Sequence, residues 1–241
     1  DRILRGTLLS GKRIRIFGPP GIIKNVRGKI DSYTWNLIKS YPVSYEVVEL
    51  NQNKEEYQTA VFSAFDGFEP VYGSVKHDDI KLKDGFEFDF ELFDHRVPSA
   101  GYRINEKKMV AVDKEALEQK GYKSGKWLGE LKNRILSGEM DTVLKAETQD
   151  GEKEIMVEQA AKDFIEYIPP QSITFITDIA PTLENCCKAA RLAKDTTLLL
   201  IEGVFIKDDV LHANRKKHLT LDLSKLIFRN SGAKKVRFFH F

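Results

Sequence analysis

The sequence predicts a mixed α/β fold, because short strand patterns alternate with helical patterns along most of its 241 residues. Arg13 to Phe17 alternates apolar and basic residues and runs through the turn GPPG into a helical pattern. The segments SITFITD and TLLLIEG, at residues 172–178 and 197–203, are further strands followed by loops or helices. A hydrophobic content of 41% is sufficient for a substantial core.

The remaining elements follow from the same periodicities. Pro181 is expected early in a helix, and Gly232 is expected to end one. Strands are predicted at 45–50, 86–93, 109–112, 142–146 and 234–241, with another strand after the turn at 95–98. Helices are predicted at 22–41, 181–194 and 218–232, and the charged stretch 114–168 is expected to be mainly helical.

Composition excludes several classes of protein. Lys and Arg number 38 against 36 Asp and Glu, so net charge does not indicate nucleic-acid binding. No apolar run is long enough for a membrane span, so no membrane association is expected. The only cysteines, Cys186 and Cys187, are adjacent, which argues against a disulfide framework and predicts a cytoplasmic protein. The GPPG turn lacks the glycine and lysine spacing of a phosphate-binding loop.

Polar side chains end several of the predicted strands. FITD ends in Asp178, LLLIE in Glu202, VRFFH in His240 and FELFDH in His95. Asp178 or Glu202 alone could cap a helix or a turn, and a lone histidine after a strand could be a structural residue. Together, however, two imidazoles and a carboxylate are preferred ligands for Zn²⁺ or a similar divalent ion. Because strand ends in layered α/β folds carry functional groups, these residues predict one site.

Motifs across the chain resemble ribonuclease Z and its relatives in the metallo-β-lactamase superfamily. The similar segments are, in order, IRIFGPPG, FDHRVPSAGYRI, GKWLGELK, FITD, LLLIEG, HLT and the terminal HF. The resemblance implies a metallo-β-lactamase-type four-layer αββα sandwich, here lacking its N-terminal part. It also implies that residues 1–241 form one such domain, N-terminally incomplete.

The same resemblance implies roles for five residues. His95 and His240 each bind one metal ion, and Asp178 bridges two divalent ions, with Zn²⁺ the expected metal. Glu202 and His218, aligned with the family's H-E-A-T and H-S-T elements, form a proton-handling pair. The family's first ligand cluster, H-x-H-x-D-H, occurs nowhere in the sequence. We therefore expect it upstream of Asp1, and we expect the centre within this chain to be incomplete.

The expected function is that of a metal-dependent hydrolase, a phosphodiesterase or endoribonuclease of the tRNA 3′-processing type. Its substrate would be RNA or a small phosphodiester, and a homodimer is compatible with the family. Ile201, Gly203 and Leu219 depart from the family motifs and indicate a divergent relative. The alternatives are a hydrolase of cyclic nucleotides or other small phosphodiesters, and a noncatalytic relative that binds nucleic acid. That relative would use the basic residues around Trp127, which are Lys120, Lys123, Lys126, Lys132 and Arg134.

Overall fold

The computed structural model describes residues 2–80, 82 and 85–240, and it divides the chain into two compact units. Unit 1 comprises Asp1–Ile104 and Ser172–Phe241, and unit 2 comprises Asn105–Gln171. In the sequence, unit 2 is inserted between two strands that pair in one sheet of unit 1. The expectation that residues 1–241 form a single domain stays a prediction.

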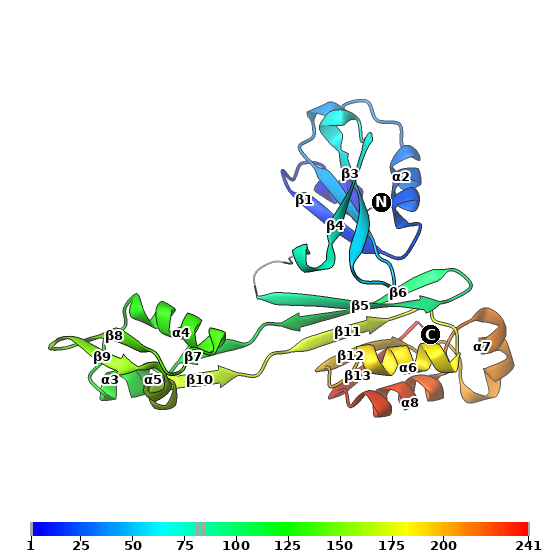
Figure 1. Cartoon of the computed structure of the whole chain (residues 1–241). Helices are drawn as coiled ribbons and strands as arrows, with labels where there is room; N and C mark the ends of the chain where they lie inside the picture. The colour runs from blue at the N-terminus through cyan, green and yellow to red at the C-terminus, as the bar shows by residue number, and fades with distance from the viewer. Residues whose placement is uncertain (1, 81, 83–84, 241) are drawn as a thin grey trace. The chain divides into compact units, whose positions relative to one another are not determined.

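The N-terminal part of unit 1 contains a four-stranded sheet in the order β1-β2-β3-β4 (Figure 1). Its strands are β1 (Arg13–Gly18), β2 (Ser44–Glu49), β3 (Glu56–Ser63) and β4 (Pro70–Lys76), preceded by α1 (Arg2–Thr7). β1 and β2 are parallel, and α2 (Ile22–Asp31) forms the crossover between them, as the strand, GPPG turn and helix pattern predicts. β3 and β4 follow as antiparallel strands.

The predicted helix at 22–41 is wrong in its second half. Helix α2 ends at Asp31, and the chain forms only a short 3₁₀ turn, Ile38–Ser40, before β2. The indole of Trp35 donates a hydrogen bond to the carbonyl of Ile30 at 3.1 Å, which folds the following segment back over the end of the helix. Packing of Tyr33 and Trp35 against the core therefore stops the helix earlier than its periodicity suggested.

The second sheet of unit 1 has five strands in the order β13-β12-β11-β6-β5. Their bounds are β5 (Phe86–Asp94), β6 (Pro98–Glu106), β11 (Ser172–Ile176), β12 (Leu198–Glu202) and β13 (Lys235–Phe239). β11, β12 and β13 are mutually parallel, so their carboxyl ends lie at one edge. The connecting helices are α6 (Leu183–Leu192), α7 (Val210–Lys216) and α8 (Leu221–Ser231). Only α7, a short helix rich in polar residues, was not expected.

Three hydrophobic clusters place these elements in four layers. One cluster joins α2 to the four-stranded sheet and includes Ile23, Val47 and Phe62. A second lies between the two sheets, where Tyr57 packs with Phe90. A third packs α6 and α8 on the outer face of the five-stranded sheet (Figure 1). The order is helix, sheet, sheet, helix, which is the four-layer order that the family resemblance implies.

Unit 2 has its own core, formed by residues that include Leu117, Trp127, Leu131 and Phe164. It contains β7 (Met109–Val112), α3 (Lys114–Gln119), α4 (Trp127–Ser137), β8 (Val143–Thr148), β9 (Gly151–Met156), α5 (Val157–Phe164) and β10 (Ile165–Ile168). β7 pairs with β10, so the two ends of the unit are adjacent. The sequence predicted β7, α3, α4 and β8 but not the strands β9 and β10, so the expectation that 114–168 is mainly helical is wrong: helices cover less than half of it.

Among the described residues, no helix is both long and apolar enough to cross a membrane.

Candidate metal centre

The carboxyl edge of the five-stranded sheet brings three of the predicted residues together. Asp178 lies two residues after β11, Glu202 is the last residue of β12, and His240 follows β13. Glu202 is in register with Phe239, the residue before His240. Parallel pairing therefore aligns the three side chains at one edge, because each strand delivers its polar residue at the same level.

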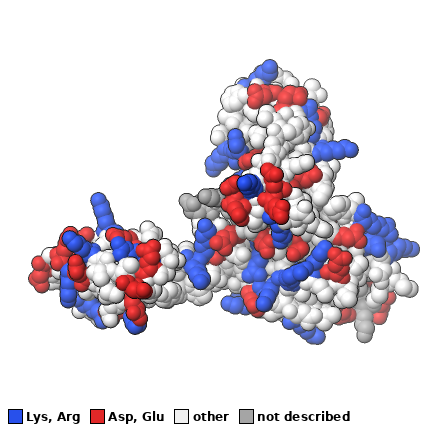
Figure 2. Space-filling view, viewed as in Figure 1, with Lys and Arg blue, Asp and Glu red and all other residues white. Residues whose placement is uncertain are grey.

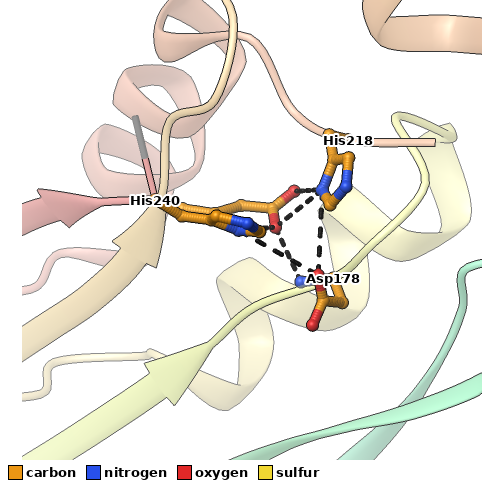
Figure 3. Close-up of side chains that lie close together, drawn as sticks. Asp178, His218 and His240 are labelled. Atoms are coloured by element: carbon orange, nitrogen blue, oxygen red, sulfur yellow. Dashed lines mark hydrogen bonds and ion pairs between the residues drawn. The ribbon is translucent and has the colours of Figure 1, made fainter. Parts of the chain in front are cut away.

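These three residues and His218 form a group whose ligand atoms all lie within 4.8 Å of one another. His218 Nδ1 is 3.9 Å from Asp178 Oδ1, and His240 Nδ1 is 4.0 Å from the same oxygen. Figure 3 shows both imidazoles turned toward Asp178. Two metal bonds of ~2.0–2.2 Å can span up to about 4.4 Å, so either pair could reach a common cation.

The carboxylate of Glu202 is fully buried and connects three loops. It accepts hydrogen bonds from the backbone N–H of Asp178 at 2.6 Å and of Leu219 at 2.9 Å. His218 Nδ1 lies 3.2 Å from its Oε2 atom, and His240 Nδ1 lies 3.7 Å from the same atom. A buried carboxylate is tolerated only when it is well hydrogen-bonded, and these donors meet that need.

His218 is held between α7 and α8. The preceding residue, Lys217, ends α7 in the left-handed conformation, and Thr220 caps α8 by accepting a hydrogen bond from the backbone of Leu223. The imidazole ring of His218 stands nearly perpendicular to that of His240, with centroids 5.1 Å apart. The side chain is mostly buried, so it is not the solvated helix residue that its neighbouring lysines alone would suggest.

His95 reaches the same edge from the loop between β5 and β6. Its ring centroid is 4.6 Å from that of His218, although His95 is not in the four-residue group. His95 Nδ1 is 2.7 Å from the carbonyl oxygen of Lys217. Histidines that bind metal ions typically donate their second ring N–H to a carbonyl or carboxylate. This contact leaves Nε2 of His95 available as a ligand atom.

Backbone strain is concentrated at this site. Seven described residues other than glycine have positive φ, and four of them adjoin or belong to the centre: Arg96, Asp178, Lys217 and His240, with φ between 53° and 64°. Residues other than glycine adopt positive φ at a cost in free energy, and residues in this conformation cluster at functional sites. Asp178 and His240, both members of the four-residue group, are thus held in this conformation just after their strands.

The donor atoms suit a divalent transition metal ion. Imidazole nitrogens and carboxylate oxygens are the usual ligands of Zn²⁺ and comparable ions. Glu202 already accepts hydrogen bonds from two backbone N–H groups, which favours a supporting role for its carboxylate. The residues present therefore fit part of a metal centre.

The other two histidines have separate structural contacts. His77 Nδ1 is 2.7 Å from the hydroxyl of Tyr57, and the ring of His212 packs at a tilt against Phe205, with centroids 5.0 Å apart. Neither belongs to the four-residue group. Both placements agree with the structural roles that their isolation in the sequence suggested.

Some of the basic residues around Trp127 in unit 2 are paired with neighbouring carboxylates. Lys120 pairs with Asp163, Arg134 pairs with Glu130, and Trp127 is buried in the core of the unit. Residues 105–171 contain 11 Lys and Arg against 14 Asp and Glu, a net charge of −3. Figure 2 shows positive and negative side chains mixed over this unit on the visible face.

Comparison with known proteins identifies sequence relatives named Ribonuclease Z. The chain is 28% identical to that of Streptococcus suis over 158 residues, which cover 65% of this chain and 46% of the relative. It is 32% identical to that of Streptococcus equi subsp. zooepidemicus over 62% of this chain and 43% of the relative. It is 27% identical to the Ribonuclease Z of Lactobacillus helveticus, over 94% of this chain and 59% of the relative. No protein-family model matches the sequence.

A crystal structure of the short form of human tRNase Z has a similar fold. Its TM-score is 0.51 at 12% sequence identity, and the alignment covers 99% of this chain and 65% of that chain. The chain spans about half the length of the curated relatives that it matches. The fold and the resemblance predicted from the sequence are thus confirmed.

Proposed function

We propose that this ribonuclease Z-like chain, which has the metallo-β-lactamase fold, belongs to a metal-dependent hydrolase that cleaves phosphodiester bonds in RNA. In this proposal His95, Asp178 and His240 are metal ligands, and His218 and Glu202 handle the proton. The observation that supports it most is the contact of His218 with buried Glu202, directly beside Asp178 and His240.

Divalent ions bound at this edge would supply positive charge to a phosphodiester and lower the pKa of bound water. Asp178 would help to hold these ions, and its Oδ1 atom already faces both His218 and His240. Glu202 fixes the orientation of the His218 ring through Nδ1. Nε2 of His218 would then donate a proton to the leaving oxygen, and the Glu202 carboxylate would stabilise the imidazolium.

A two-metal centre requires more ligands than this group supplies. We propose that they come from an H-x-H-x-D-H cluster outside the 241 residues, since none of the five histidines has that spacing. An apolar strip on the five-stranded sheet supports this proposal. Ile173 and Phe175 of β11 are 48% and 38% exposed, and Phe175 stacks on Phe239, next to His240. A strand layer that carried further ligands would bury this strip.

RNA is the proposed substrate because the sequence relatives are named Ribonuclease Z. The noncatalytic alternative relied on the basic residues around Trp127. Two of these residues are paired with carboxylates, and their unit is net acidic, so the structure gives that alternative little support. No contact in the described residues favours a cyclic nucleotide over RNA.

The test is metal analysis combined with hydrolysis of a 3′-extended tRNA by the natural protein. We expect bound transition metal and cleavage of the RNA, and we expect His240→Ala to lose both. His77→Ala is a matched control, because His77 contacts Tyr57 and lies outside the metal group. Equal metal content in the two variants would contradict the ligand assignment. Full metal occupancy without hydrolysis of any phosphodiester would contradict the enzymatic proposal.

A further inference from the structure

Asn185 lies in the first turn of α6 and is only 2% exposed. Thr182 already caps this helix, because its hydroxyl accepts a hydrogen bond from the backbone N–H of Asn185 at 3.2 Å. The side chain of Asn185 is therefore not needed as a cap. A buried amide must have other partners, because an unpaired polar group inside a protein is destabilising.

Those partners are backbone groups at the start of the His95 loop, where β5 ends, and in the loop after β11. Nδ2 of Asn185 donates to the carbonyl of Asp94 at 2.8 Å and to the carbonyl of Ala180 at 3.0 Å. Oδ1 accepts a hydrogen bond from the N–H of Asp94 at 3.3 Å. A direct bond from Ala180 N–H to the Asp94 carbonyl, at 2.8 Å, joins the same loops. Both donor hydrogens and the acceptor oxygen of the amide are thus in use.

The two loops carry proposed metal ligands. Asp94 immediately precedes His95, and Ala180 lies two residues after Asp178. We propose that Asn185 is a positioning residue that sets the spacing between the His95 and Asp178 loops and thereby tunes metal affinity. This inference rests on the proposed function to the extent that His95 and Asp178 bind metal ions.

An amide is the side chain that suits this place. Aspartate would direct a carboxylate at the carbonyls of Asp94 and Ala180, because it lacks the two N–H donors. Alanine would leave those carbonyls and the Asp94 N–H without their shared partner. Groups that orient metal ligands from behind typically change metal affinity by 10–100-fold when removed.

The experiment compares Asn185→Ala with Thr174→Val as a control in the natural protein. Thr174 is fully buried on β11, and its hydroxyl bonds to Thr196 at 3.1 Å, in the same strand that leads to Asp178. Both variants lose a buried hydrogen bond, but only Asn185 contacts the ligand loops. Co²⁺ affinity and the visible absorption of bound Co²⁺ are measured, and Asn185→Asp is added in case the alanine variant does not fold.

We expect Asn185→Ala to bind Co²⁺ roughly 10–100-fold more weakly with an altered spectrum, while Thr174→Val matches the wild type. Equal affinity and an unchanged spectrum in all three proteins would overturn the inference but leave the proposed function intact. If the wild type binds no metal, the proposed function fails. Hydrogen exchange of the Ala180 amide in the metal-free protein then tests the inference. We expect Asn185→Ala, but not Thr174→Val, to accelerate this exchange. An unchanged exchange rate in Asn185→Ala would overturn the inference.

Discussion

The imidazole of His218 lies 3.2 Å from the buried carboxylate of Glu202. That carboxylate also accepts the backbone N–H of Asp178, so one side chain links the loop after β11 to the segment between α7 and α8. Glu202 therefore serves the fold and the site together. Its substitution should affect stability even before any metal is bound.

Glu202→Gln should lower the free energy of unfolding by about 1–3 kcal/mol in metal-free protein. The glutamine amide keeps one acceptor oxygen, but its NH₂ group would face a backbone N–H of Asp178 or Leu219. Urea unfolding followed by circular dichroism measures the change.

Glu184→Gln is the matched control for this substitution. Glu184 forms an ion pair with Lys188 four residues later on α6, and its side chain is largely exposed. Exposed ion pairs of this kind contribute little to stability, so we expect the free energy of unfolding to change by no more than about 0.5 kcal/mol. Equal destabilisation by the two substitutions would show that Glu202 does not organise the loops.

The sequence was sufficient to predict the residues that gather at the sheet edge. Asp178 and His240 each follow an apolar strand, Glu202 ends one, and parallel pairing aligns the ends of those strands. That inference needs only strand periodicity and the expectation of parallel strands. The position of His218 beside Glu202 was implied only by the family resemblance, because it depends on how α7 and α8 approach the sheet.

Other features depend on tertiary contacts that periodicity does not encode. The end of α2 is set by the packing of Trp35, and the contact of His95 with the Lys217 carbonyl joins residues 122 positions apart. Asn185 has a common residue type for a first helical turn, so nothing in its sequence position indicates its bonds to Asp94 and Ala180. The compact core of unit 2 was missed for the same reason.

The two adjacent cysteines should react at different rates with a thiol reagent such as DTNB. Burial, and then the neighbouring Cys187, raise the pKa of Cys186, whereas the Cys187 side chain is exposed. A raised pKa leaves less thiolate at pH 8, so Cys186 should react slowly and gain rate as the pH rises toward that pKa. We expect Cys187→Ser to remove the fast phase. A fast phase that survives in Cys187→Ser would contradict this assignment.

The two tryptophans should report separate unfolding transitions. Trp35 packs in unit 1 and Trp127 in unit 2, and these are the only tryptophans of the chain. Trp35→Phe leaves a probe of unit 2, and Trp127→Phe leaves a probe of unit 1. In urea, fluorescence of Trp127 should give the shallower transition, because the smaller unit exposes less surface on unfolding. Coincident transitions with equal slopes in both variants would indicate one cooperative domain.

We infer that His218 transfers a proton and is not a metal ligand. The most direct test is the effect of His218→Ala on the hydrolysis of two substrates by the natural protein. With an RNA phosphodiester, kcat should fall about 10²–10⁴-fold while metal content stays near that of the wild type. With bis(p-nitrophenyl) phosphate, whose leaving group needs no proton, the loss should be far smaller. Loss of metal as in His240→Ala, or equal slowing of both substrates, would contradict the account and make His218 a metal ligand or a structural residue.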